Sequence, residues 1–190
     1  MKDWVKTFLN NQFICMGEVN EHNIYSELAY SLNIDFGKEG YHIENQNVIL
    51  DFIDIFGSVL ADLPENVFKK LYEMKNLFFI FTPCPMSEVK VFKLKKDMKE
   101  KESLTIVNFP YTSYNVPVEG FENFSKKQLI RGEIVHEIAH VYKGCEIRSP
   151  EIEFETDEIA KSWGFKKEIE AKETLIQYWF KKEMKGGETE

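Results

Sequence analysis

In the first part of the chain, apolar residues recur every three or four positions, as they do along one face of an α-helix. Four segments show this pattern: residues 4–9, 23–34, 47–63 and 65–75, the last two separated by Pro64. Proline interrupts a helix interior because it lacks an N–H group and crowds the preceding turn. We therefore predict that residues 1–75 form a mainly helical scaffold.

Residues 76–110 follow the shorter period of β-strands. The apolar run 76–82 is typical of a buried strand, whereas 88–95 mixes lysines with apolar side chains, as a partly exposed strand does. A charged connection then leads to a third run, 103–110. We expect the second and third strands to form a hairpin, with a bulge or a different boundary where the alternation slips near Val91.

The rest of the chain returns to helical spacing, and the expected helices have recognisable end signals. The first runs from a cap at Asn123 or Ser125 to Gly144, the second from Ser149 and Pro150 to Gly164, and the last over residues 166–184. At 3.6 residues per turn, the first of these helices has about five turns.

Length and composition are those of a globular protein. The chain has 190 residues, of which 43% are hydrophobic and 14% aromatic, enough for one well-filled core. No internal repeat and no long linker divides it. We predict a single α+β domain over residues 1–190, with the strands of 76–110 between the helices of 1–75 and those of 123–184.

Charge and cysteine usage narrow the choice of partners and compartment. A net charge of -8 disfavours unassisted binding to nucleic acid or to an anionic membrane, because both are polyanions. Cys15, Cys84 and Cys145 are odd in number and widely scattered, which favours a reducing compartment over a disulfide framework. No window reads as a signal peptide or a membrane span, so we expect a cytoplasmic protein. No oligomeric state is predicted.

The segment 132–144, GEIVHEIAHVYKG, carries the strongest chemical signal. The chain has four histidines, and two of them, His136 and His140, lie four residues apart here with Glu137 between them. On a helix, residues four apart differ by only about 40° around the axis, so both imidazoles project side by side. This spacing suits two ligands of one Zn²⁺ ion, and Glu137, about 100° from His136, is positioned to act as a general base toward the metal-bound water.

The next helix offers the third ligand. Glu153, Asp157, Ala160 and Gly164 fall on one narrow face of that helix, with two carboxylates followed by two small residues that allow close helix packing. We predict that Glu153 binds the metal and that Asp157, one turn later, accepts the free ring N–H of a liganding histidine. The competing interpretations are hydrogen-bonded core histidines and a solvated acidic helix face.

Taken together, HEIAH, EFETD and IAKSWGF resemble the gluzincin group of zinc metallopeptidases over roughly residues 128–165. In that group, two motif histidines and a downstream glutamate bind zinc, and an aspartate commonly follows the glutamate by four positions. The resemblance implies a zincin-like fold with a small sheet of about three or four strands packed on the active-site helix. It also implies an edge strand that holds extended peptide, for which 103–110 is the candidate.

We therefore expect a single-zinc peptidase that hydrolyses a peptide bond in a peptide or specific protein substrate. The chain departs from larger members in having no histidine after His140 to stabilise an oxyanion. The candidates for that role or for substrate contact are Tyr178, Arg148, Tyr114 and Tyr142.

Two other interpretations stay open at this point. In one, the protein is a metal amidase like the peptide deformylases, which use the same motif but recruit a cysteine, here Cys84. In the other, it is a regulatory or interaction protein that contains zinc and does not catalyse a reaction.

Overall fold

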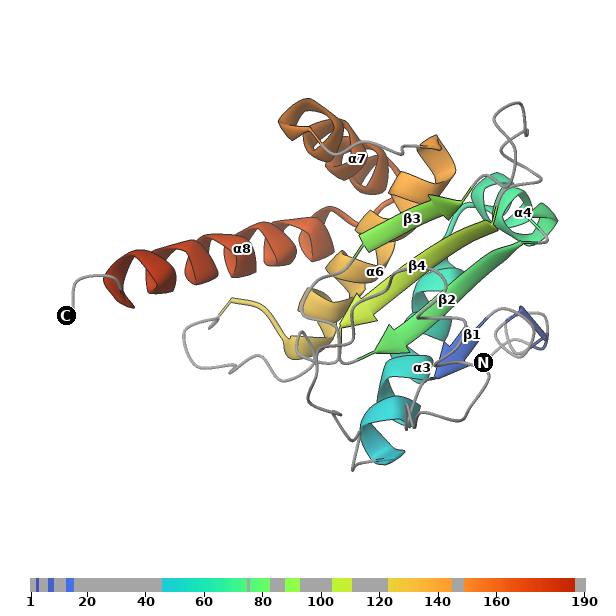
Figure 1. The fold of residues 1–190 in the computed structure, drawn as a ribbon, viewed down its shortest axis with the longest axis horizontal. Coiled ribbons are helices and arrows are strands. Elements are labelled where there is room, and N and C mark those ends of the chain that lie inside the picture. The colour runs from blue at the N-terminus through green and yellow to red at the C-terminus, as the bar shows by residue number, and fades with distance from the viewer. Residues whose placement is uncertain are drawn as a thin grey trace. The chain divides into compact units, whose positions relative to one another are not determined.

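The computed structural model describes residues 3, 7–8, 13–15, 46–74, 76–82, 88–92, 104–110, 123–144 and 149–186. They belong to two compact units, Met1–Asn115 and Val116–Glu190. The described part of the first unit contains a four-stranded sheet with helices, and that of the second contains helices (Figure 1). The predicted α+β class is confirmed, while a single domain over 1–190 stays a prediction.

The first unit follows the predicted order of helices and strands. Its described elements are β1 (Phe13–Cys15), α3 (Gln46–Asp62), α4 (Glu65–Glu73), β2 (Leu77–Thr82), β3 (Glu88–Phe92) and β4 (Leu104–Pro110). Thr7 and Phe8 are helical, as expected for 4–9, whereas the helix expected at 23–34 lies outside the described residues. The short strand β1 was not predicted, because three residues are too few to show a period.

The strand order is β1-β2-β4-β3. β1 and β4 both pair with β2 in parallel, and β3 pairs with β4 antiparallel, which confirms the predicted hairpin. The β3–β4 register runs without interruption from Glu88 opposite Asn108 to Phe92 opposite Leu104, so the described part of β3 has no bulge.

The prediction that residues 103–110 form the edge strand is wrong. β4 lies between β2 and β3, and its backbone pairs on both sides. A strand paired on both sides has no free row of N–H and C=O groups to offer an extended peptide. Among the described strands, β3 and β1 are the outer ones.

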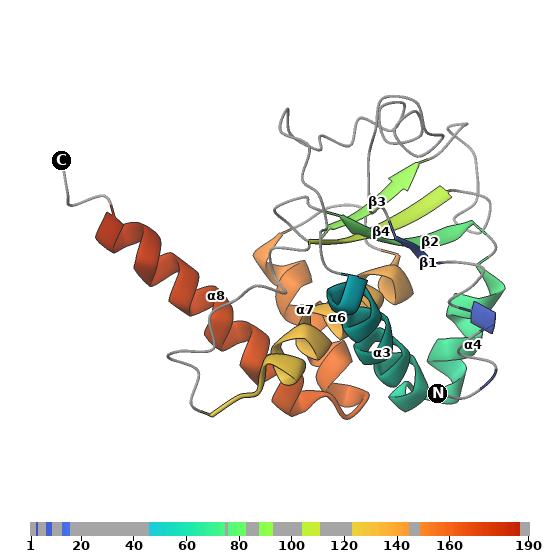
Figure 2. The same cartoon turned by 90° about the horizontal axis from the view of Figure 1, so that it is seen from below.

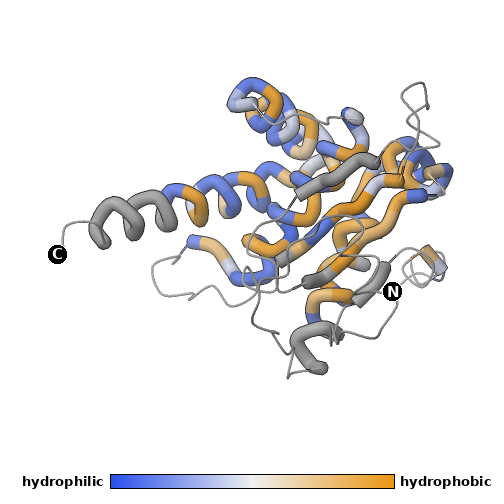
Figure 3. The backbone as a smooth tube through the Cα atoms, in the orientation of Figure 1, coloured by the Kyte–Doolittle hydropathy of each residue, from blue (hydrophilic) through white to orange (hydrophobic). Residues whose placement is uncertain are grey.

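α3 and α4 lie on one face of the sheet (Figure 2), and aromatic side chains pack between these elements. On α3, Phe56 packs edge-on against Phe79 of β2, with 4.9 Å between ring centroids, and contacts Phe109 of β4 at 5.6 Å. Phe8 lies 5.4 Å from Phe68 of α4 and 5.9 Å from Phe79. These rings form a hydrophobic core between the helices and the sheet. β2 and β4, which contribute to it, are mostly apolar (Figure 3).

The second unit contains α6 (Lys126–Lys143), α7 (Pro150–Ser162) and α8 (Lys166–Gly186), and each of these helices contacts the other two. Several predicted end signals are confirmed. Ser125, not Asn123, caps α6, and Gly144 ends it with a φ of 73°. Ser149 caps α7, followed by Pro150 in the first turn. Among the described helices, none is both long and apolar enough to cross a membrane.

Gly164 does not lie in a helix–helix contact, although its place on the predicted packing face suggested one. It lies beyond the end of α7 with a φ of 98°, a left-handed conformation that closes the helix, as its end signal indicated. It is exposed, and a Cβ built there meets no atom within 4 Å. Ala160 is fully buried, so only this member of the predicted pair of small residues lies in the helix packing.

Candidate metal centre

Local hydrogen bonds fix where α6 begins and where it ends. Ser125 N–H donates to Oε1 of Gln128 at 2.9 Å, and Gln128 N–H donates back to Oγ of Ser125 at 3.2 Å. At the other end, Gly144 N–H donates to the carbonyl of His140 at 3.0 Å. With its ends fixed, α6 buries Ile134 and Ile138 completely and presents the two histidines on another face.

His136 and His140 converge through their Nε2 atoms, which are 3.0 Å apart. Their rings are nearly perpendicular, with an interplanar angle of 89° and 4.6 Å between centroids. Both are buried, with His136 5% and His140 3% exposed. The predicted side-by-side projection of two imidazoles is therefore present, and the same nitrogen atom of each ring points at the shared location.

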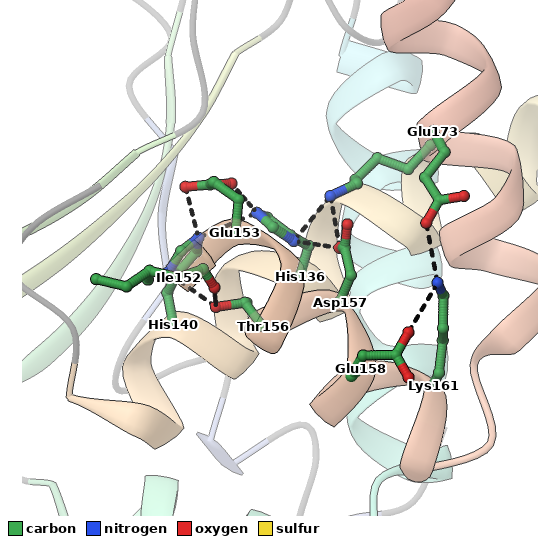
Figure 4. A network of polar contacts seen from close by, with 10 residues as sticks. His136, His140, Ile152, Glu153, Thr156, Asp157, Glu158, Lys161 and Glu173 are labelled. Carbon is green, nitrogen blue, oxygen red and sulfur yellow. Dashed lines mark hydrogen bonds and ion pairs between the residues drawn. The ribbon is translucent and has the colours of Figure 1, made fainter. Parts of the chain in front are cut away.

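Glu153 of α7 reaches the same location (Figure 4). Its Oε2 lies 3.0 Å from Nε2 of His136, and its Oε1 lies 3.4 Å from Nε2 of His140. The Glu153 side chain is 36% exposed, the most accessible of the three. One donor atom from each residue can be chosen so that all lie within 4.8 Å of one another.

Asp157 determines which ring nitrogen of His136 carries the proton. Its Oδ1 lies 2.7 Å from Nδ1 of His136. Burial favours the neutral form of Asp157, but the hydrogen bond with His136 and the Lys172 ammonium outweigh it and hold the pKa of Asp157 below its ordinary value of 3.8. An ionised carboxylate only accepts, so Nδ1–H of His136 donates and Nε2 presents its lone pair.

Thr156 plays the corresponding part for His140. The Thr156 hydroxyl donates to the carbonyl of Ile152 at 2.7 Å, which commits its only proton. Its oxygen lies 3.4 Å from Nδ1 of His140 and is left to accept from that ring. His140 thereby also presents the lone pair of Nε2 toward Glu153.

Two imidazole lone pairs and a carboxylate consequently face one another, an arrangement that needs a positive charge between them. In the metal-free protein, a proton on His136 can supply this charge. Burial lowers the pKa of His136, but its hydrogen bonds to Asp157 and Glu153 outweigh burial and raise the pKa above 6.5. Zn²⁺ fits the same donors. Tetrahedral zinc at 2.0 to 2.1 Å from its ligands separates them by about 3.3 Å. The two Nε2 atoms here are 3.0 Å apart, and each lies 3.0 or 3.4 Å from a different oxygen of the Glu153 carboxylate.

Glu137 lies between the two histidines in sequence and is 3% exposed. Its negative charge is close enough to contribute to the raised pKa of His136. The structure thus places the predicted base beside the first histidine, within the buried part of α6.

Most of the candidate oxyanion residues fall outside the part of the chain that the structure describes. Arg148 and Tyr114 lie outside it, as do Cys84 and Cys145, and the Tyr178 side chain is not described. Tyr142 packs edge-on against Trp163, with 5.2 Å between ring centroids and an 88° angle, as a packing residue would.

Sequence reasoning missed two residues of the site, Thr156 and Lys172. Thr156 follows Glu153 by three positions and so lies one turn below it beside Asp157, a relationship that helical spacing could have indicated. Lys172 falls on the buried face of α8 with Ile169, and Phe165, just before the helix begins, is buried as well. A lysine on an apolar stripe was the available signal, because lysine is rarely buried without a partner.

Comparison of the chain with known protein families, curated proteins and solved structures finds no match.

Proposed function

We propose that the protein is a zinc-dependent peptidase in which His136, His140 and Glu153 hold one zinc ion and Glu137 is the general base. The observation that carries this proposal is the meeting of two Nε2 lone pairs and a carboxylate at contacts of 3.0 to 3.4 Å. A zincin-like packing of the sheet on α6, a peptide or protein substrate and a cytoplasmic location belong to the same proposal.

The size of the donor set supports a catalytic site. Within the described residues, the group that could hold a metal has three members. Structural zinc sites are usually closed by four protein ligands, whereas catalytic ones use three and leave a position open. When bound, zinc would supply a Lewis acid that promotes ionisation of water and polarises a substrate carbonyl.

Glu137 would accept a proton from the attacking water and return it to the leaving amine. His136 and His140 would keep their Nδ1 protons throughout, because Asp157 and Thr156 accept from those atoms. The hydrogen bonds that orient the two rings would therefore not change when Glu137 takes up or releases a proton. Glu153 is the most accessible of the three ligands, and substrate would approach the metal from its side.

The first test is zinc content. Protein purified without added metal should contain about one zinc per chain, with a nitrogen and oxygen shell in X-ray absorption at the zinc edge. Absence of zinc, even after addition of one equivalent, would overturn the proposal. A sulfur ligand would instead favour the deformylase-like alternative.

The second test is the Glu137→Gln variant, assayed on a peptide library by mass spectrometry. It should keep zinc and lose turnover by about 10² to 10⁴-fold, because only the proton acceptor is removed. Full turnover in that variant would reject the mechanism. Zinc without turnover in the unmodified protein would instead favour a zinc-containing regulatory protein.

A further inference from the structure

Lys172 of α8 is a buried cation next to the candidate metal centre. It is 7% exposed. Its Nζ lies 2.6 Å from Oδ1 of Asp157 and 2.9 Å from Nδ1 of His136. Removing an ammonium from water costs several kcal/mol unless it is paired, so this lysine is held there by specific partners.

We propose that Lys172 is a positioning residue of the metal site, which pins the carboxylate of Asp157 against Nδ1 of His136 and so keeps Nε2 of His136 directed at Glu153 and His140. The inference rests on the proposed zinc site and extends it to a third helix. α8 would then control how well α6 and α7 hold metal.

One carboxylate oxygen serves both neighbours. Oδ1 of Asp157 accepts from Nζ of Lys172 at 2.6 Å and from Nδ1 of His136 at 2.7 Å. Hydrogen bonds from a cation to a carboxylate are about twice as strong as neutral ones. The Lys172 ammonium therefore donates an N–H to Asp157 in preference to Nδ1 of His136, which keeps its own proton and donates to the same carboxylate. Because Oδ1 is pinned by the ammonium, the carboxylate cannot rotate away from the ring.

The backbone of α6 and α8 sets the position of Lys172. A Cβ at Gly132 would lie 2.1 Å from the Glu168 carbonyl oxygen and 3.2 Å from Cβ of Lys172. On the adjacent position of α6, Arg131 pairs with Glu168 at 3.2 Å and lies over the Phe165 ring at 5.3 Å. The two helices meet here without room for a side chain, so Lys172 has little freedom to move away from Asp157.

The two liganding histidines are consequently supported unequally. Nδ1 of His136 meets a carboxylate backed by a cation, whereas Nδ1 of His140 meets the Thr156 hydroxyl at 3.4 Å. Loss of Lys172 should act on His136 alone.

The test is zinc affinity, measured by competition with a chelator, in Lys172→Met and in a matched control. Lys161→Met is that control, because Lys161 also joins α7 to α8 but pairs with Glu158 at 3.1 Å and Glu173 at 3.0 Å. Figure 4 shows Lys161 between Glu158 and Glu173. We expect Lys172→Met to weaken zinc binding about tenfold, the usual effect of losing an outer partner of a ligand, and Lys161→Met to leave it unchanged.

A double variant tests whether Lys172 acts through Asp157. Asp157→Asn should weaken zinc binding, and adding Lys172→Met to it should cause no further loss, because the carboxylate to be pinned is already gone. This double variant carries neither buried charge and so remains informative if Lys172→Met alone does not fold. A further loss of affinity in the double variant overturns the proposal.

The second readout needs no metal. In the metal-free protein at alkaline pH, ¹⁵N spectra of His136 should show the proton on Nδ1 in the unmodified chain and in Lys161→Met, and a mixture of tautomers in Lys172→Met. Unchanged tautomer and unchanged zinc affinity in Lys172→Met overturn the inference while leaving the zinc site intact. Failure of the unmodified protein to bind zinc overturns the proposed function instead.

Discussion

Nε2 of His136 lies 3.0 Å from Oε2 of Glu153, a residue 17 positions away on the next helix. In neutral His136 the proton is on Nδ1, where it donates to the Asp157 carboxylate, so neither Nε2 of His136 nor Oε2 of Glu153 is a donor. The contact is therefore favourable only with a positive charge beside it, a proton in the metal-free protein or a zinc ion in the proposed peptidase. The following predictions depend on this relationship.

Replacing Glu153 by Ala should weaken zinc binding by more than about 100-fold, because a direct ligand is removed. Losing a residue that only hydrogen-bonds to a ligand costs up to about 100-fold. Equilibrium competition with a chelator measures the affinity. Glu155→Ala is the matched control, since Glu155 lies on the same helix but pairs with Lys143. Equal affinities in the two variants would remove Glu153 from the ligand set.

Zinc should stabilise the second unit, because a ligand that binds only the folded chain shifts the folding equilibrium. At free zinc 100-fold above the dissociation constant, the gain in unfolding free energy is about 2.7 kcal/mol. Denaturant unfolding with zinc and with EDTA measures it. The Glu153→Ala protein should show no such difference, and a zinc effect of equal size in that variant would place the binding site elsewhere.

As the pH is lowered, zinc affinity should begin to fall at a higher pH than it would for a histidine with an ordinary pKa. The pKa of His136 in the metal-free protein is raised above 6.5, so protons compete with zinc for Nε2 already above that pH. Affinity should fall as the pH is lowered through the raised pKa of His136. Titration of zinc release measures this, and retention of full affinity down to pH 6.5 would contradict it.

The same raised pKa has a consequence for folding in the metal-free protein. A proton is bound more tightly in the folded than in the unfolded chain, so the stability it contributes is fully present below pH 6.5 and is lost as the pH rises through the folded pKa of His136. Denaturant unfolding in EDTA at several pH values measures this. A rise in the unfolding free energy over that window would contradict the assignment.

Gly132→Ala should destabilise the protein by about 1 to 3 kcal/mol, the usual cost of forcing an extra methyl into a packed interior. The new Cβ would lie 2.1 Å from the Glu168 carbonyl, so α8 must move and Lys172 with it. Zinc affinity should fall as well. Chelator competition and denaturant unfolding together measure both effects.

Gly164→Ala is the control for the glycine substitution. It faces open space but has a φ of 98°, so it should lower stability by about 1 to 2 kcal/mol through backbone strain and leave zinc affinity unchanged. If Gly132→Ala changed stability and kept full zinc affinity, the link from α8 to the metal site would be refuted.

Most helices and three strands were predictable because their signals are local. Ser125 and Gly144 mark the ends of α6, and apolar residues recur with the helical period between them. The interval of four residues by itself places His136 beside His140, and the same interval places Asp157 one turn after Glu153. These relationships follow from backbone geometry within one helix.

Other features depend on contacts between distant segments. The sequence did not indicate β1, a three-residue strand held by its neighbour β2, nor that β4 lies inside the sheet. It also did not pair Lys172 with Asp157 or assign the Thr156 hydroxyl to His140.

The sequence by itself therefore determined which residue types share a helical face, and hence the donors of the candidate metal site. Only the tertiary structure decided which donor atoms meet, which tautomers they adopt and which cation lies behind them. The physical reason is the distance along the chain over which each interaction acts. Backbone hydrogen bonds within one turn decide which residues share a helical face. The approach of α8 to α6 at Gly132 depends instead on packing between segments 36 residues apart.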